Sequence, residues 1–388
     1  MKDVFIAGAA RTPMGGLQGV FSDVPAAELG GAAIAGAVAD AFAPTERIEE
    51  VLMGCVLPAG QGQAPARQAG FAAGLDDQVP ATTLNKMCGS GMKTTMMAFD
   101  AVALGQVDMI VAGGMESMTR APYLLPGMRS GARLGHGQVQ DSMFLDGLED
   151  AYDKGRLMGT FAEDTAEKYQ FTREAQDAYA IRSLERALAA QENGGFAREI
   201  VPVTVHTRRG DIEVGADEQP AKARPEKIPR LKPAFREGGT VTAANSSSIS
   251  DGAAALVLAS AGSGLKPRAR ILGHASHAQA PAWFSTAPIP AAQKLLDRIG
   301  WTKDDVDLWE VNEAFAVVPM AFMHDMGIAP DIMNVNGGAC ALGHPIGASG
   351  ARIIVTLLNA LEARGLKRGV AAISIGGGEG TAIAIELV

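Results

Sequence analysis

Apolar positions in this chain fall into short runs separated by turns that are rich in glycine and polar residues. Brief runs are typical of buried strands, and longer stretches rich in small residues are typical of helices. The expected strands are residues 4–8, 50–54, 109–112, 270–272, 308–311 and 370–375. The expected helices are residues 29–42, 65–73, 173–191, 289–299 and 347–364, with another that ends near residue 104. This alternation predicts an α/β fold with a buried, largely parallel sheet.

Two parts of the chain repeat one order of features. In each, a Gly-Ser-Gly or Gly-x-Ser-Gly turn opens a helix, a strand follows, and the strand ends in Gly-Gly-x-Glu, at residues 113–116 and again at 376–379. We interpret this as an internal duplication of one α/β unit. Coincidence between two ordinary strand–helix units is the alternative.

The duplication divides the chain into three parts. The N-terminal half comprises residues 1–118 and 249–267, the C-terminal half comprises residues 268–388, and residues 119–248 are inserted between them. The inserted part differs in character, with prolines, repeated glycines, a charged helix and a basic stretch. The basic side chains of that stretch are Lys222, Arg224, Lys227, Arg230, Lys232 and Arg236. We expect a covering loop domain whose cations either meet phosphates or form a solvated surface.

Composition narrows the class of protein. A chain of 388 residues, 47% of them apolar, can build two or three domains with large cores. A net charge of −9 argues against general nucleic-acid binding, although a local basic patch could still hold an anionic ligand. Three cysteines do not make a disulfide framework, which favours a reducing, cytoplasmic location. The first residues resemble a strand rather than a signal peptide, and no membrane span is expected.

Cys88 is the candidate nucleophile. It lies in Asn-Lys-Met-Cys-Gly-Ser-Gly at residues 85–91, between a short extended run and the turn that opens a helix. Free backbone N–H groups and the dipole at a helix N-terminus favour a thiolate, which can attack an acyl carbonyl and hold the acyl group. The alternative is a buried, inert cysteine.

His344 is its candidate partner. It occupies the same place before the second repeated helix that Cys88 occupies before the first. Two helices packed between two sheets would bring their N-termini together, so that His344 could take the Cys88 proton and later return one. An amide at Asn312 could polarise a carbonyl oxygen, and the backbone N–H groups at Gly376 suit an oxyanion hole.

These motifs resemble those of the thiolase family, which contains acetyl-CoA acetyltransferases and 3-ketoacyl-CoA thiolases, and the resemblance runs from end to end. The matching segments are residues 85–91, 113–118, 312–315 and 343–347. The resemblance implies a five-layered α/β/α/β/α thiolase fold with a covering loop domain, assembled as a homodimer or a dimer of dimers (a homotetramer). It also implies no metal, a place in fatty acid metabolism, and coenzyme A and acyl-CoA as substrates rather than a resident cofactor.

The resemblance also assigns roles. Cys88 is the acylated nucleophile, and His344 is its proton partner and an oxyanion donor. Asn312 holds an oxyanion-hole water, and the N–H groups of Cys88 and Gly376 form a second hole. Substrate and CoA contacts are implied for Ser247, Phe235, Phe315, Ala243, Met158 and Leu157, and phosphate contacts are expected of Lys222, Arg224 and Lys227. Short-chain biosynthetic members carry histidine where Leu157 stands, which indicates either a wider acyl range or a simple pocket filler.

Ser374 departs from the family pattern, which has a second cysteine before Ile-Gly-Gly-Gly. In condensation that thiolate removes a proton from the methyl carbon of acetyl-CoA, and in thiolysis it returns one. A thiol has a pKa of about 8.5, and a serine hydroxyl is a far weaker acid. We therefore expect acylation of Cys88 to persist and the carbon–carbon bond step to weaken. An engineered trap and a natural variant both fit, as do a related condensing enzyme and a catalytically impaired CoA-binding scaffold.

Overall fold

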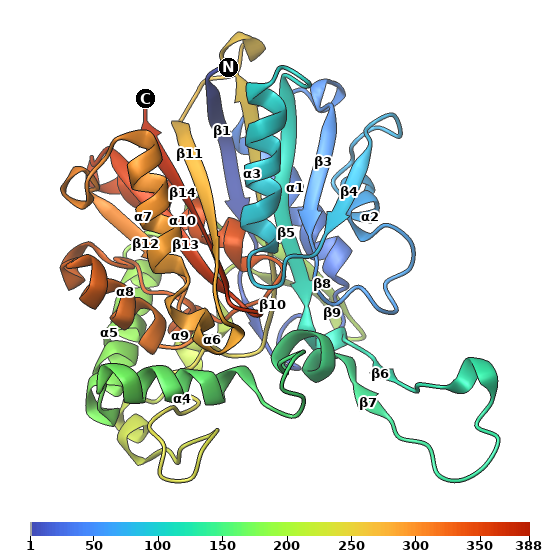
Figure 1. Cartoon of the computed structure of the whole chain (residues 1–388). Helices are drawn as coiled ribbons and strands as arrows, with labels where there is room; N and C mark the ends of the chain where they lie inside the picture. Colours follow the sequence, from blue (N-terminus) through green and yellow to red (C-terminus); the bar gives the residue numbers. More distant parts are fainter. Residues whose placement is uncertain (1) are drawn as a thin grey trace.

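The computed structural model describes residues 2–388, and within that range ten strands join in a single sheet (Figure 1). The order of the strands is β12-β13-β14-β11-β1-β10-β5-β3-β4, with β2 paired to β10. The strand bounds are Val4–Arg11 (β1), Gly15–Gly16 (β2), Glu50–Gly54 (β3), Ala81–Leu84 (β4), Met109–Ser117 (β5), Ser250–Ser260 (β10), Ala269–Ala278 (β11), Leu308–Val311 (β12), Arg368–Ile375 (β13) and Glu379–Leu387 (β14).

The expectation of a largely parallel sheet is wrong. Strand β3 is parallel to β4 and β5, and β12 is parallel to β13, but β10 and β14 run antiparallel to both of their neighbours. Neither β10 nor β14 was expected from the sequence. Both are buried on their two faces, so they lack the polar alternation that marks an antiparallel strand with one solvated face.

The two halves of the sheet repeat each other, which supports the duplication. In the N-terminal half the order is β1-β10-β5-β3, and in the C-terminal half it is β11-β14-β13-β12, with the same relative directions. The halves join where β1 pairs with β11, at Phe5 opposite Arg270. In each half the helix before the corresponding strand, α3 before β5 and α10 before β13, follows a glycine-containing turn.

Helices lie in three layers around the two halves of the sheet. The helix bounds are Ala26–Asp40 (α1), Pro65–Ala72 (α2), Ser90–Ala103 (α3), Met158–Tyr169 (α4), Arg173–Glu192 (α5), Glu218–Lys222 (α6), Pro288–Ile299 (α7), Val317–Met326 (α8), Ala339–Leu342 (α9) and Ser349–Arg364 (α10). Helices α3 and α10 share one core with strands of both halves, while α1 and α2 cover the outer face of one half and α7 and α8 that of the other.

Strand β10 shows how the layers form. Leu256 belongs to the central core and its neighbour Val257 to the outer core, because successive side chains of a strand point to opposite faces. The resulting order is helices, sheet, helices, sheet, helices. In Figure 1, α7 and α8 lie to the left and α2 lies to the right.

Most of the part of the chain between β5 and β10 lies beyond the ends of the strands, opposite the two termini (Figure 1), while Val203 and Val205 pack into the outer core beside α1. It contains α4, α5 and α6 and two short hairpins, formed by Tyr123–Leu124 (β6) with Gln140–Asp141 (β7) and by Val203–Thr207 (β8) with Gly210–Val214 (β9). The β6–β7 hairpin projects from the body as an arm. Within residues 2–388, no helix is both long enough and apolar enough to cross a bilayer.

Candidate active site

The turn that carries Cys88 is held by side-chain hydrogen bonds. The Met87 N–H donates to Asn85 Oδ1 at 2.9 Å, and the Lys86 N–H donates to Ser90 Oγ at 2.8 Å. The Ser90 hydroxyl in turn donates to the Met87 carbonyl at 2.6 Å. These bonds hold Met87 at a φ of 48°, a left-handed conformation that is strained for a residue with a side chain. Cys88 is therefore fixed at the entrance to α3.

Two glycines bring the first turns of α3 and α10 into contact. A Cβ atom on Gly91 would lie 2.8 Å from the backbone nitrogen of Ala351, and one on Gly350 would lie 2.3 Å from that of Met92. Any larger residue would push the helices apart. The expected meeting of the two helix N-termini is confirmed, and it brings the segments with Cys88 and His344 to one cavity.

This acyl cavity has a volume of about 360 Å³. Cys88, His344 and Gly376 line it together. The substrate-binding residues expected from the sequence that also line it are Leu157, Met158, Phe235, Ala243, Ser247 and Phe315. Apolar residues that sequence reasoning did not find complete the wall, among them Phe144, Leu148, Ile249, Phe284 and Ile346. The cavity thus surrounds the nucleophile mostly with hydrocarbon, as a small-molecule pocket does.

The backbone N–H groups around Cys88 favour its thiolate, but burial of the thiol opposes the thiolate more strongly. Burial raises the pKa of the Cys88 thiol to about 11, against hydrogen bonds from the N–H groups of Gly376 and of Cys88 itself, which lower it. The nearby Glu116 carboxyl raises it further. Desolvation outweighs the two N–H donors. A proton acceptor is therefore needed to form the thiolate.

His344 lines the same cavity as Cys88 and is the candidate acceptor of that proton. Its Nδ1 lies 2.5 Å from Ser349 Oγ, and that hydroxyl donates its proton to the Pro345 carbonyl at 3.0 Å. Ser349 must therefore accept from His344, so Nδ1 carries the hydrogen and Nε2 is free as a base. Burial and the Arg352 charge lower the pKa of His344 to about 3, which keeps the ring neutral. The Asn312 amide nitrogen lies 3.5 Å from Nε2.

Asn312 and Ser374 do not line the acyl cavity. Both are fully buried, and neither is among the residues that line the acyl cavity. The Asn312 Oδ1 and Ser374 Oγ atoms have no hydrogen-bond partner in residues 2–388. Such unpaired buried oxygens are the places where ordered water is expected.

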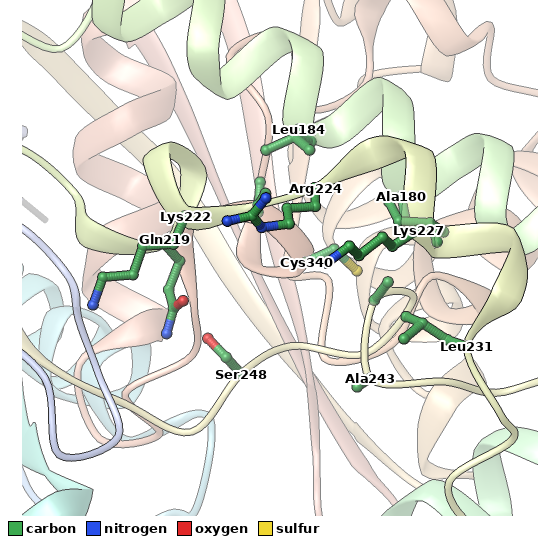
Figure 2. A pocket seen from close by; sticks show the side chains of 14 residues that line it. Ala180, Leu184, Gln219, Lys222, Arg224, Lys227, Leu231, Ala243, Ser248 and Cys340 are labelled. Carbon is green, nitrogen blue, oxygen red and sulfur yellow. The ribbon is translucent and has the colours of Figure 1, made fainter.

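A second cavity, the basic cavity, adjoins the first. It has a volume of about 330 Å³ and is lined by Lys222, Arg224 and Lys227. In Figure 2 these basic side chains lie on one wall, with Ser248 and Ala243 on the other. Because Ala243 and Ser248 line both cavities, a long ligand can extend from the cations to Cys88.

Within residues 2–388 the three cations are not equally free. Lys222 forms an ion pair with Glu218, whereas Arg224 and Lys227 form none. All three side chains are exposed, and Arg224 and Lys227 are available to pair with the charges of a ligand. The phosphate site expected from the sequence therefore has two unpaired cations.

Glu116 is a support that the sequence did not reveal. Its carboxylate accepts N–H groups from Val56 at 2.9 Å, from Leu57 at 3.1 Å and from Gly347 at 3.0 Å. Gly347 follows His344 by three residues, so Glu116 ties the histidine turn to the opposite half. Burial raises the pKa of Glu116 to about 7. Its position at the end of a Gly-Gly-x-Glu strand was the signal, but its partners could not be read from it.

Glu313 supports the other side of the histidine segment. Its carboxylate accepts hydrogen bonds from Tyr179 at 2.8 Å, Ser183 at 2.7 Å, Asn334 at 2.9 Å and the Cys340 N–H at 3.0 Å. Burial and Glu313 together raise the pKa of the Cys340 thiol. Cys340 lines the basic cavity and not the cavity that contains Cys88, which argues against a role as substitute for the missing second cysteine.

Comparison with known proteins identifies the family. The family models of the thiolase N-terminal domain and the thiolase C-terminal domain match residues 4–262 and 265–387. Acetyl-CoA acetyltransferase 2 of Arabidopsis thaliana is 50% identical over 395 residues, covering 100% of this chain and 98% of that protein. Acetyl-CoA acetyltransferase of Cupriavidus necator is 47% identical and covers 100% of both chains.

Solved structures agree. The acetyl-CoA acetyltransferase of Bacillus anthracis superposes with a TM-score of 0.97 at 40% identity, covering 100% of this chain and 99% of that one. A thiolase of Ascaris suum in complex with coenzyme A gives a TM-score of 0.94 at 42% identity, covering 100% of both. The chain belongs to the thiolase family, and the α/β thiolase fold expected from its motifs is confirmed.

Proposed function

We propose that this chain is a CoA-dependent acyltransferase that works through an acyl thioester on Cys88. The observation that carries the proposal is the placement of Cys88, His344 and the Gly376 N–H around one cavity that shares lining residues with a basic one. The acetyl-CoA acetyltransferase names of the full-length relatives, and the coenzyme A complex of the Ascaris suum thiolase, support the substrate class.

Substrate binding uses both cavities. The phosphates of CoA meet Arg224 and Lys227, and the pantetheine arm passes Ala243 toward Ser247, Phe235 and Phe315. The two aromatic rings are stacked edge to face, with centroids 5.9 Å apart, and so form a firm wall. This arrangement would place the thioester carbonyl beside Cys88.

Acylation moves one proton from Cys88 to His344 and then from His344 to the departing CoA sulfur. His344 Nε2 takes the Cys88 proton, the sulfur bonds to the acyl carbon, the bond from that carbon to the CoA sulfur breaks, and the departing sulfur takes the proton from His344. The N–H groups of Cys88 and Gly376 stabilise the negative charge on the acyl oxygen. A water held by Asn312 would stabilise an enolate oxygen on the second substrate, and His344 would join it while its Nε2 carries a proton.

The step that makes or breaks the carbon–carbon bond depends on the side chain at position 374. A second acetyl-CoA must lose a methyl proton before its carbon can attack the acyl group, and Ser374 offers a hydroxyl where a thiolate would serve better. We propose that the chain acylates normally and makes or cleaves 3-ketoacyl-CoA slowly. A CoA-binding scaffold with no acylation is the alternative that Ser374 favours.

Mass spectrometry distinguishes an acyltransferase from a CoA-binding scaffold. After incubation with acetyl-CoA, an acyltransferase gains one acetyl group, and peptide mapping places it on Cys88. The C88A variant should gain none, and C340A, as the matched control, should gain one as before. An acetyl group found only on Cys55 or Cys340, or on no residue, contradicts the proposal.

Assembly, location and domain division are further parts of the proposal. The sheet ends at β4, whose residues are partly exposed, and the projecting arm carries exposed Tyr123, Leu125, Leu134 and Val139, which favours a homodimer or a dimer of dimers. Unpaired cysteines support a reducing, cytoplasmic location. The division at residues 118, 248 and 267 predicts protease cuts near those positions. Light scattering measures the oligomer directly.

A further inference from the structure

We propose that the ion pair between Lys86 and Glu379 is a positioning device that holds the Gly376 N–H against Cys88 and thereby sets the geometry of the oxyanion hole. The pair lies outside the cavity lining, and neither residue was singled out by the sequence for a role. The catalytic role of this oxyanion hole rests on the proposed function. The inference that the ion pair positions the oxyanion hole rests on the structure alone.

The two donors of this hole come from opposite halves of the chain. The Cys88 N–H belongs to the turn before α3, and the Gly376 N–H belongs to the β13–β14 hairpin. Lys86 precedes Cys88 by two residues, and Glu379 follows Gly376 by three. Within residues 2–388, a side-chain hydrogen bond from Lys86 to Glu379 joins these two segments, residues 85–89 and residues 376–380.

The β11 side of the hairpin tip is held by backbone contacts, because the Gln279 N–H donates to the Gly378 carbonyl at 2.8 Å and Glu379 pairs with Ala278. Gly377 and Gly378 have φ values of 91° and 85°, a conformation that glycine adopts freely, and neither has a side chain to pack. On the side that faces the Cys88 turn, Ile375 packs against Gly89, because a Cβ atom on Gly89 would lie 2.3 Å from its Cδ1. The ion pair and Ile375 therefore join the hairpin to the Cys88 turn, while the backbone pairing with β11 holds its other side.

The ionisation of Cys88 reports this geometry. The Gly376 N–H lowers the pKa of the Cys88 thiol, so movement of the hairpin away from the sulfur raises that pKa. Loss of the negative charge on Glu379 acts through space with the opposite sign, because it would lower the pKa of a nearby thiol. The E379Q variant therefore separates a positioning role from a simple charge effect.

The first measurement is the rate of Cys88 alkylation by iodoacetamide as a function of pH. For the unaltered chain the midpoint is expected at about 11. In E379Q we expect it at higher pH, and in E386Q, a matched change at an ion-paired glutamate on the same strand, we expect no change. A midpoint that stays or moves down in E379Q overturns the proposal.

The second measurement is single-turnover acylation by acetyl-CoA. We expect E379Q and K86M each to slow the saturated rate by about tenfold, a fraction of the loss for deleting an oxyanion donor, with unchanged half-saturating acetyl-CoA. The reversed pair K86E/E379K should recover most of the rate. A double variant as slow as the singles overturns the proposal. If the unaltered chain is not acylated at all, the proposed function fails, and the alkylation profile still tests the ion pair.

Discussion

The Ser349 hydroxyl accepts a hydrogen bond from His344 Nδ1 at 2.5 Å while it donates to the Pro345 carbonyl. One serine, five residues after the histidine, thus selects the tautomer whose Nε2 faces the site. A carboxylate in this place would also stabilise the charged ring, which a hydroxyl does weakly. His344 therefore stays neutral and serves as a proton carrier for a short time.

The S349A variant tests this tautomer. Without the hydroxyl, both tautomers become populated and the ring loses its anchor, so single-turnover acylation should slow by about tenfold. Deletion of the base itself in H344A should cost about 10²–10⁴-fold. The exposed serine variant S130A is the control. Acylation of S349A at the normal rate would mean that other contacts orient His344.

The two unpaired cations of the basic cavity should bind the CoA phosphates. In an R224A/K227A variant we expect the acetyl-CoA concentration for half-maximal acylation to rise about tenfold, and its dependence on salt to weaken, because fewer ionic contacts remain to be screened. The exposed basic pair in R208A/R209A, at the tip of the β8–β9 hairpin, is the matched control. An unchanged salt response would make this stretch a solvated surface only.

Glu116 should leave a pH signature in stability. Its folded pKa of about 7 lies above its ordinary value of 4.5, so the folded state binds the proton more tightly than the unfolded state does. The stability that this proton contributes is present below pH 4.5 and is lost as the pH rises through 7. Relative to E116Q, the unfolding free energy should fall by about 3 kcal/mol across that range, measured by urea unfolding. Parallel pH curves for the two proteins would contradict this.

The sequence predicted which turns meet better than it predicted the directions of the strands. Cys88, His344 and Gly376 each stand in a glycine turn beside a repeated element, and the repeat itself predicts that the turns meet. Strand direction could not be read in the same way, because β10 and β14 are buried on both faces. The pKa of the Cys88 thiol also depends on Gly376 and Glu116, which lie far from Cys88 in the sequence and which local sequence does not bring together.

The sequence did not reveal the hydrogen bonds and ion pairs that join distant segments, for a related reason. Glu116 binds Gly347, and Lys86 pairs with Glu379, across more than two hundred residues of chain. Each residue alone is an ordinary charged side chain near a motif. Only the packing of α3 against α10, which brings the halves together, gives these side chains their partners.

The central claim is that acyl transfer to Cys88 is intact while position 374 limits the carbon–carbon step. The most direct test compares the chain as given with S374C, using acetoacetyl-CoA and CoA and following loss of the 3-ketoacyl enolate absorbance, with acetylation of Cys88 measured by mass in both. We predict equal acetylation and thiolysis faster by about 10²–10⁴-fold in S374C, the usual contribution of one acid–base group. Thiolysis by the serine form at the rate of the cysteine form would contradict the account, because another group would then carry the proton.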